Sequence, residues 1–460
     1  MSSVAEVGAV QSSEFSSRRL RHASILVFAG YAAGQILRLG SNLVMTRLLA
    51  PEMFGLMALA NVVVAGVQML TDMGINKSII QNKDGVEQPF LNTAWALQIL
   101  RGVSLAAIVW GFALTLWIVG PNGSSTNVYS HPDLPIVLAI LASSLVISGF
   151  RPTKTAVANR DLQLGRITAI DLMTQIIGIV AMILWASYSP SVWALVAGTV
   201  ISSVVRITAE NICLSGVGNS WQWDRGYAKQ IFHFGKWIFF TSLLSYWVLN
   251  GDRIILGFDI NAHEMGIYSI AVFIVGSVRG ALNTIMQKVM YPAMSRKLRE
   301  SSDCTDMYYR FRLPLDFVIC SLCGFLVVSG DQIVRLLYDE RYSQAGIFLS
   351  FLSLGLIADR YRGLGLYYQA EGEPKKMMSV ALSRALLLTI GLPFALFSYD
   401  LIGAVVFLGV YPIFIIPLQL YLKYKAGLMS VYREIAYTSF IVPGVAAGYF
   451  FTWLTSYVVN

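Results

Sequence analysis

Long apolar runs constrain the fold of this sequence more than any other feature. Each run has about 20 residues, enough for an α-helix to cross the ~30 Å hydrocarbon core of a bilayer. In the first half of the chain the runs begin near His22, Met53, Asn92, Pro135, Ile167 and Pro190. After a polar segment they resume near His233, Gly266, Leu313, Ala345, Met377 and Leu401, and a last run covers Arg433–Val458. We therefore predict an all-α integral membrane protein with about 12 to 14 transmembrane helices.

The composition and the short loops exclude several classes of protein. Hydrophobic residues make up 56% of the chain and charged residues only 13%, and the mean hydropathy is +0.61, values that are unlike those of a soluble domain. The longest outer loop, Gly120–Leu134, has no room for a folded catalytic domain. The sequence shows no phosphate-binding loop and no two histidines with metal-ligand spacing. Cys320 and Cys323 form a C-x-x-C, but it lies inside an apolar run that offers little stabilisation of a thiolate, so we interpret the two cysteines as small packing residues. We predict no enzyme activity, no metal and no cofactor.

Lysine and arginine residues gather in alternate loops, which predicts the orientation. They are frequent in the segment 1–21 and in the loop around Arg296, whereas the opposite loops at Gly120–Leu134 and Ser398–Asp400 contain none. Since basic loops stay in the cytoplasm, we expect a cytoplasmic N-terminus. The net charge of +8 then reflects topology, and nucleic acid is not a predicted partner.

Two matching stretches indicate an internal duplication. Thr46–Ala60 reads TRLLAPEMFGLMALA and Asp252–Ala271 reads DRIILGFDINAHEMGIYSIA. Each places a glutamate and then a glycine, Gly55 or Gly266, at the start of an apolar helix. Each stretch joins the first two spans of its half. Since six spans separate the two starts, both halves begin on the cytoplasmic side, and they are predicted to be parallel repeats.

The duplication defines the predicted domains. The two six-helix lobes occupy residues 22–214 and 233–423. The remaining segments are a cytoplasmic tail at 1–21, a cytoplasmic linker at 215–232 and an extra transmembrane helix at 424–460.

Arginines dominate the ionisable residues inside the apolar runs. A charged side chain at a helix centre costs at least ~2.5 kcal/mol unless it faces a partner or a water-filled cavity. Near helix ends, snorkelling to the headgroups is the alternative interpretation. A cavity lined by arginines would bind an anion, and guanidinium groups hold phosphate oxygens well. The predicted substrate-binding residues are Arg38, Arg101, Arg253, Arg279, Arg360 and Arg384.

Acidic residues are fewer in these runs and lie nearer the ends. They are candidates for ion coupling or gating, since carboxylates inside a membrane often take part in ion pathways. The residues selected for this role are Asp72, Asp252 and Asp316.

Four segments resemble the polysaccharide transporter family, which comprises the O-antigen and exopolysaccharide flippases. They read NLVMTRLLAPEMFGLMALA, DMGINKSIIQ, NGDRIILGFDINAHEMGIYSIA and MYPAMSRKL, and the resemblance runs from about Ser24 to about Lys376. The family belongs to a superfamily that also contains the multidrug exporters of the MATE type and the lipid II flippase. One departure is the unpartnered last run, since family members usually have an even number of spans.

The resemblance implies both architecture and function. It implies two lobes around a cationic cavity in the bacterial inner membrane. The implied cargo is an oligosaccharide linked to undecaprenyl diphosphate, carried from the cytoplasmic to the periplasmic leaflet for O-antigen, capsule or exopolysaccharide synthesis. A polysaccharide polymerase and a chain-length regulator are candidate partners.

Two other functions stay open at this point. A MATE-like small-molecule exporter coupled to Na⁺ or H⁺ would have the same fold, but acids should then dominate its cavity. A membrane enzyme of polysaccharide assembly would need a large outer loop or a buried histidine beside a carboxylate, and neither is evident in the sequence.

Overall fold

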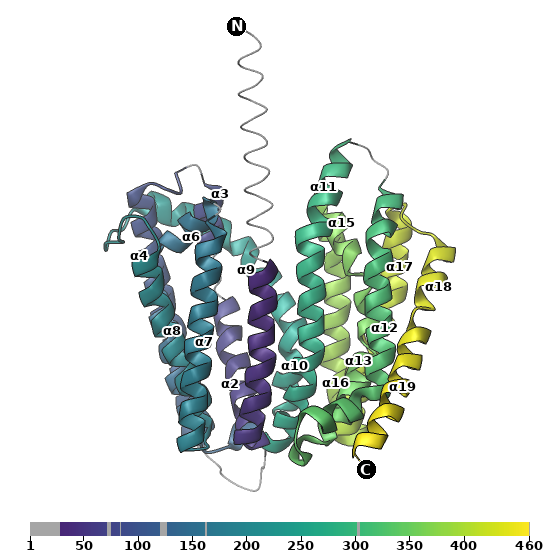
Figure 1. Ribbon diagram of the computed structural model, residues 1–460. Helices are drawn as coiled ribbons and strands as arrows, with labels where there is room; N and C mark the ends of the chain where they lie inside the picture. The colour runs from purple at the N-terminus through teal and green to yellow at the C-terminus, as the bar shows by residue number, and fades with distance from the viewer. Residues whose placement is uncertain are drawn as a thin grey trace. The chain divides into compact units, whose positions relative to one another are not determined.

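The computed structural model describes residues 28–70, 75–82, 84–119, 127–161, 163–300 and 304–459. Within these ranges the chain forms helices joined by turns, without β-strands. The chain divides into two compact units (Figure 1). The first unit comprises Met1–Leu49, Val63–Asn122 and Pro132–Leu243, and the second comprises Ala50–Val62, Gly123–His131 and Leu244–Asn460. The all-α class is confirmed.

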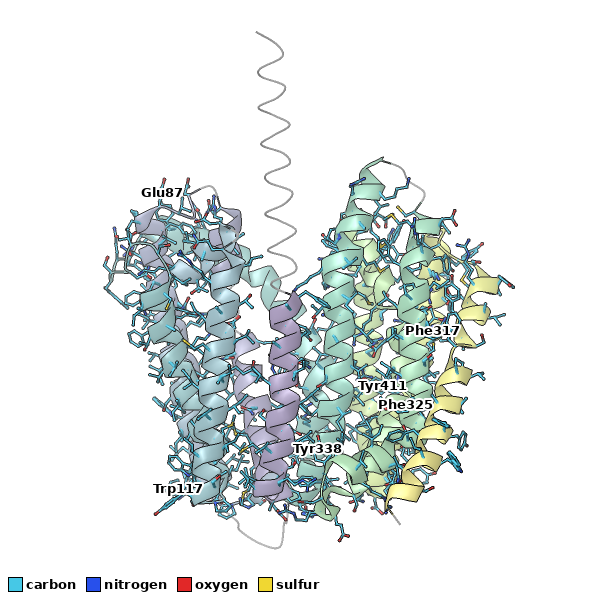
Figure 2. All side chains as sticks on the ribbon, in the orientation of Figure 1. Glu87, Trp117, Phe317, Phe325, Tyr338 and Tyr411 are labelled. Carbon is cyan, nitrogen blue, oxygen red and sulfur yellow. The ribbon has the colours of Figure 1, made fainter. Side chains whose placement is uncertain are left out.

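Paired long helices build the first unit. It contains a helix over residues 28–48, then α3 (Ile75–Gln81), α4 (Gln88–Val119), α5 (Leu134–Gly149), α6 (Lys154–Arg160), α7 (Leu164–Tyr188), α8 (Val192–Cys213) and the start of α9 (Arg225–Leu256). Helix α4 packs along α5, and α7 packs along α8. Glu87 and Trp117 mark opposite ends of α4 in Figure 2. Gly102 lets α4 approach α5 closely, since a Cβ there would lie 2.7 Å from the carbonyl oxygen of Leu145.

The second unit holds most of the later helices. They are α10 (Ala262–Ile285), η2 (Met286–Met290), α11 (Tyr291–Glu300), α12 (Thr305–Leu337), α13 (Gln344–Ser353), α14 (Leu356–Asp359), α15 (Arg362–Glu371), α16 (Met378–Val410), α17 (Ile416–Lys425), α18 (Val431–Thr438) and α19 (Ile441–Val459). The first part of α2 (Pro51–Leu70) also belongs here. The last predicted run forms α18 and α19, and α19 packs along α12. Phe317 and Phe325 of α12, labelled in Figure 2, contact aromatic rings of this terminal segment.

Helix α16 is a helical hairpin. Asp400 has a φ of 56°, which breaks the helix between the predicted runs that begin near Met377 and Leu401. A Cβ on Gly391 would overlap the ring of Phe407, and a Cβ on Gly403 would lie 3.2 Å from the carbonyl oxygen of Ala395. Segments on either side of the break therefore lie against each other. The turn predicted at Ser398–Asp400 is confirmed.

The described helices are compatible with the predicted number of spans. Eight of them are long and apolar enough to cross a membrane, or nine if α5 and α6, bent by 62°, form one span. One of the eight, residues 375–425, contains the α16 hairpin. By packing, the boundary between the units falls inside α9, after Leu243. The lobe boundaries at 22–214 and 233–423 stay a prediction.

The two matching stretches contact each other inside the second unit. A Cβ on Gly55 would overlap the carbonyl oxygen of Ala262, and a Cβ on Gly266 would overlap the carbonyl oxygen of Pro51. Glu52 Oε1 and His263 Nδ1 lie 2.8 Å apart at the same crossing. The start of α2 and the start of α10 therefore pack backbone to backbone, which only glycine permits at both positions.

Candidate functional site

A carboxylate between two arginines marks a break in the predicted tenth span. Asp359 ends the four-residue helix α14, between α13 and α15. Its Oδ2 lies 2.7 Å from Arg279 Nε on α10, and its Oδ1 lies 2.7 Å from Arg362 Nε on α15. The side chain of Asp359 is 6% exposed, whereas those of Arg279 and Arg362 are 34% and 28% exposed. Irregular backbone at membrane depth is tolerated where it is covered by protein or lines a cavity.

Gly355 opens the space for this arrangement. A Cβ at this position would lie 2.9 Å from Nη2 of Arg279. The guanidinium group therefore rests against the bare backbone next to α14. A larger residue at position 355 would displace the arginine.

A third arginine adds to the positive charge around Asp359. Arg384 on α16 is close enough to Asp359, Arg279 and Arg362 for their charges to interact. Its Nε is buried, and among the described residues it has no hydrogen-bond partner. We call Arg279, Asp359, Arg362 and Arg384 the Asp359 cluster. Two guanidinium groups contact the carboxylate of Asp359 and a third lies near it, so positive charge is in excess and a buried donor is left for an anion.

Tyrosines lie next to the Asp359 cluster. Tyr411, labelled in Figure 2, lies near the guanidinium groups of Arg384 and Arg279. Asp252 accepts a hydrogen bond from the hydroxyl of Tyr268. Arg253 Nη1 donates to Asn250 Oδ1 at 3.2 Å. Asp252 and Arg253 thus hydrogen-bond to different partners in the second unit, as expected for adjacent helical positions.

The first unit places the other two predicted arginines in two separate pockets. Arg38 lines a pocket of about 540 Å³ between the helix over residues 28–48, α7 and α8. Arg101 lines a pocket of about 310 Å³ between α4 and α5, where its Nη2 donates to the carbonyl oxygen of Gln68 at 2.6 Å. Arg38 and Arg101 are therefore not brought together. Asp72 lies outside the described residues.

Arg360 and Asp316 lie in a buried charge network instead of at a pocket. We define this network as Arg312, Asp316, Arg360, Lys423 and Glu434, all in the second unit. Arg312 bonds to Asp316 at 2.7 Å and to Glu434 at 2.5 Å, and Arg360 lies 3.3 Å from Asp316. The side chains of Arg360 and Asp316 are 2% and 1% exposed. This burial gives no support to a contact between either residue and a cargo.

Sequence reasoning misses the residues that complete both charged groups. Asp359 is not among the predicted site residues, although it lies beside Arg360 and Arg362 in an apolar run. Glu434 is predicted only as part of the last run. Arg362 is only three residues from Asp359, but Arg279 and Arg312 lie on other helices than the carboxylates with which they pair, so spacing along the chain gives no signal for those two pairs. The one signal in the sequence is that a carboxylate inside an apolar run costs free energy unless it has a partner.

Comparisons with known proteins agree with the fold and the predicted family. A family model described as "Polysaccharide biosynthesis protein" matches residues 44–346. The lipopolysaccharide biosynthesis protein WzxC of Escherichia coli (strain K12) is 22% identical over 306 residues, which cover 65% of this chain and 59% of that protein. The teichuronic acid biosynthesis protein TuaB of Bacillus subtilis (strain 168) is 23% identical over 293 residues, which cover 62% and 58%. The chain therefore spans less than two thirds of the length of either relative.

A solved structure shares the fold over nearly the whole chain. The lipid II flippase MurJ, in an inward closed conformation, superposes with a TM-score of 0.72. The match covers 95% of this chain and 99% of that one at 13% sequence identity. At this identity the likeness establishes the fold alone.

Proposed function

This chain belongs to the polysaccharide biosynthesis protein family, and we propose that it is a flippase for oligosaccharides linked to undecaprenyl diphosphate. It would carry each unit from the cytoplasmic to the outer leaflet of the bacterial inner membrane by alternating access, with its N-terminus in the cytoplasm. A polysaccharide polymerase and a chain-length regulator are proposed partners. The observation that carries the proposal is the excess of arginine in the Asp359 cluster.

The Asp359 cluster suits a diphosphate better than a cation. Without cargo, Asp359 holds Arg279 and Arg362 in place and reduces their mutual repulsion. Phosphate oxygens would bond to the guanidinium donors that Asp359 leaves open, including Arg384 Nε. A cationic drug would instead meet an excess of positive charge. The cluster therefore disfavours the MATE-like alternative.

The membrane potential can drive export of such a cargo. A diphosphate carries about two negative charges, and each gains ~2.3 kcal/mol per 100 mV on leaving a cell that is negative inside. We therefore expect flipping in liposomes to accelerate when the inside is made negative, without any Na⁺ gradient. A strict requirement for Na⁺ together with indifference to potential would contradict this mechanism.

Arg384→Gln is the sharpest variant for the proposed site. Arg384 has no ion pair among the described residues, so its loss leaves Asp359 with Arg279 and Arg362, and the protein should fold normally. A hydrogen bond to a charged group contributes ~1.5 to 3 kcal/mol, so the cargo concentration needed for half-maximal flipping should rise by about ten- to a hundredfold. Arg384→Lys should recover part of the loss, because it keeps the charge but not the fork of donors.

Reconstituted liposomes with a fluorescent lipid-linked oligosaccharide provide the measurement. Arg335→Gln is the matched control, since Arg335 pairs with Asp331 on an exposed stretch of α12 and is 58% exposed. It should flip like the wild type. If Arg384→Gln also flipped like the wild type, the Asp359 cluster would not be the diphosphate site.

A further inference from the structure

The pocket beside Arg38 has a polar lining that is unusual between transmembrane helices. It lies within the first unit and has a volume of about 540 Å³, which is typical of a small-ligand site. We call it the hydroxyl pocket. Six neutral polar side chains line it: Ser41, Thr174, Gln175, Thr199, Ser202 and Ser203.

The hydroxyl groups that line the hydroxyl pocket already donate hydrogen bonds within the protein. Each hydroxyl donates to a backbone carbonyl three or four residues earlier in its own helix, at 2.8 to 3.0 Å. Gln175 Nε2 donates to the carbonyl oxygen of Gly34 at 2.8 Å. The hydroxyls can then only accept, because each oxygen keeps a lone pair, and Gln175 keeps its carbonyl oxygen as an acceptor and one N–H. The lining therefore suits a ligand that brings several donors.

The charges at the hydroxyl pocket favour an anionic group on that ligand. Asp171 pairs with Arg206, which also lies 3.3 Å from Glu210 Oε1. Arg38 is exposed, and among the described residues no carboxylate pairs with it. An ammonium ligand could use the acceptors but would be repelled by Arg38. A polyhydroxyl ligand with an anionic group would use both.

We propose that the hydroxyl pocket binds a saccharide that carries an anionic group next to its hydroxyls. The sugar hydroxyls donate to the acceptor lining, and Arg38 holds the anionic group. The inference rests on the proposed function in one respect, since it assigns the pocket to the saccharide part of the cargo. The anionic group has two sources, a carboxylate on the sugar or a phosphate ester on it other than the diphosphate assigned to the Asp359 cluster.

Protection of a cysteine from a maleimide reagent tests the site. Of the four cysteines only Cys213 is exposed, so Cys213→Ser gives a background with low labelling. Ser203→Cys then places a thiol in the hydroxyl pocket, and Ser148→Cys places a control thiol in the pocket beside Arg101. The probes are glucose 1-phosphate, glucuronate, glucose and inorganic diphosphate.

We expect glucose 1-phosphate or glucuronate to slow labelling of the Ser203→Cys variant at lower concentrations than glucose does, without slowing labelling of the Ser148→Cys control. Whichever anionic probe protects at the lower concentration identifies the source of the charge. Adding Arg38→Gln should raise the protecting concentration of that probe by about ten- to a hundredfold and leave that of glucose unchanged. Protection by inorganic diphosphate as strong as that by the sugar anions would overturn the proposal. So would the absence of protection, or an Arg38→Gln variant that is protected like its parent.

The experiment separates this inference from the proposed function. Labelling is measured on the whole chain in detergent with soluble probes, so it requires no translocation. Protection without flipping in liposomes would retain the saccharide site and refute the flippase. Flipping without protection would refute the saccharide site and retain the flippase.

Discussion

Replacing Glu434 by glutamine should strongly destabilise the protein, because Glu434 pairs with buried cations of the charge network. Glu434 Oε1 lies 2.5 Å from Arg312 Nη1, its carboxylate also pairs with Lys423, and Oε2 accepts from the hydroxyl of Tyr361 at 3.2 Å. The side chains of Arg312 and Lys423 are 1% and 0% exposed. Breaking a buried ion pair on one side leaves a desolvated charge, which typically costs ~3 to 5 kcal/mol.

The balance of charges in the network predicts which variants are worst. Three cations face two carboxylates, so the wild type already has one positive charge in excess. Glu434→Gln raises that excess, whereas Lys423→Met removes it and keeps the side-chain volume close to that of lysine. We therefore expect Lys423→Met to cost less than Glu434→Gln, and the double variant to be more stable than Glu434→Gln alone.

The assay is thermal unfolding of the purified protein in detergent, with each variant compared under one scan rate because unfolding of such proteins is often irreversible. Asp306→Asn is the matched control. Asp306 pairs with Arg433, the neighbour of Glu434, at 3.1 Å, but its side chain is 93% exposed. Since exposed pairs contribute little, this variant should unfold like the wild type. The reasoning fails if Glu434→Gln unfolds like Asp306→Asn, or if Lys423→Met is the less stable of the two network variants.

Two further variants test the backbone geometry of the second unit. Gly266→Ala should lower the unfolding temperature because the added Cβ would overlap Pro51. Gly276→Ala is the control and should not lower it, since no atom lies within 4 Å of a Cβ at that position. Equal effects of the two variants would contradict the close crossing of α2 and α10. Asp400→Gly should raise the unfolding temperature, because the φ of 56° and ψ of −163° at this position cost a non-glycine residue of order 1 to 3 kcal/mol; a lower unfolding temperature would show that the Asp400 side chain stabilises the turn.

The sequence predicts those features of this protein that depend on single helices and not on contacts between helices. The α16 hairpin is an example, since two apolar runs separated by Ser398–Asp400 are each long enough to cross a bilayer. The pairing of Arg279 with Asp359 is of another kind. The two residues are on different helices, and their contact depends on the break between α13 and α15, which no glycine or proline pattern at Leu354–Tyr361 specifies uniquely.

The same distinction explains the two predicted residues that lie in the charge network. Arg360 and Asp316 satisfy the criterion for a functional site, because each is ionisable and each is in an apolar run. That criterion does not distinguish a charged residue that lines a cavity from one that pairs with a buried residue on another helix. Here the partners include Glu434 on α18, in the last predicted run. The extra helix therefore has a structural role that its unpartnered position in the sequence does not reveal.

The duplicated stretches show how a repeat can specify its own contact. Gly55 packs against Ala262, which lies four residues before Gly266, and Gly266 packs against Pro51, which lies four residues before Gly55. Glu52 and His263, one residue further along in each copy, face each other. Such an exchange of roles is the mark of a local two-fold relation, in which residue i contacts j and j contacts i. Each copy must then supply a glycine and also the backbone segment against which the glycine of the other copy packs. A substitution of the glycine in one copy therefore disturbs only one of the two close contacts at the crossing. This requirement gives a physical reason for the same helix start, with glycine at the same position, to occur twice in one chain.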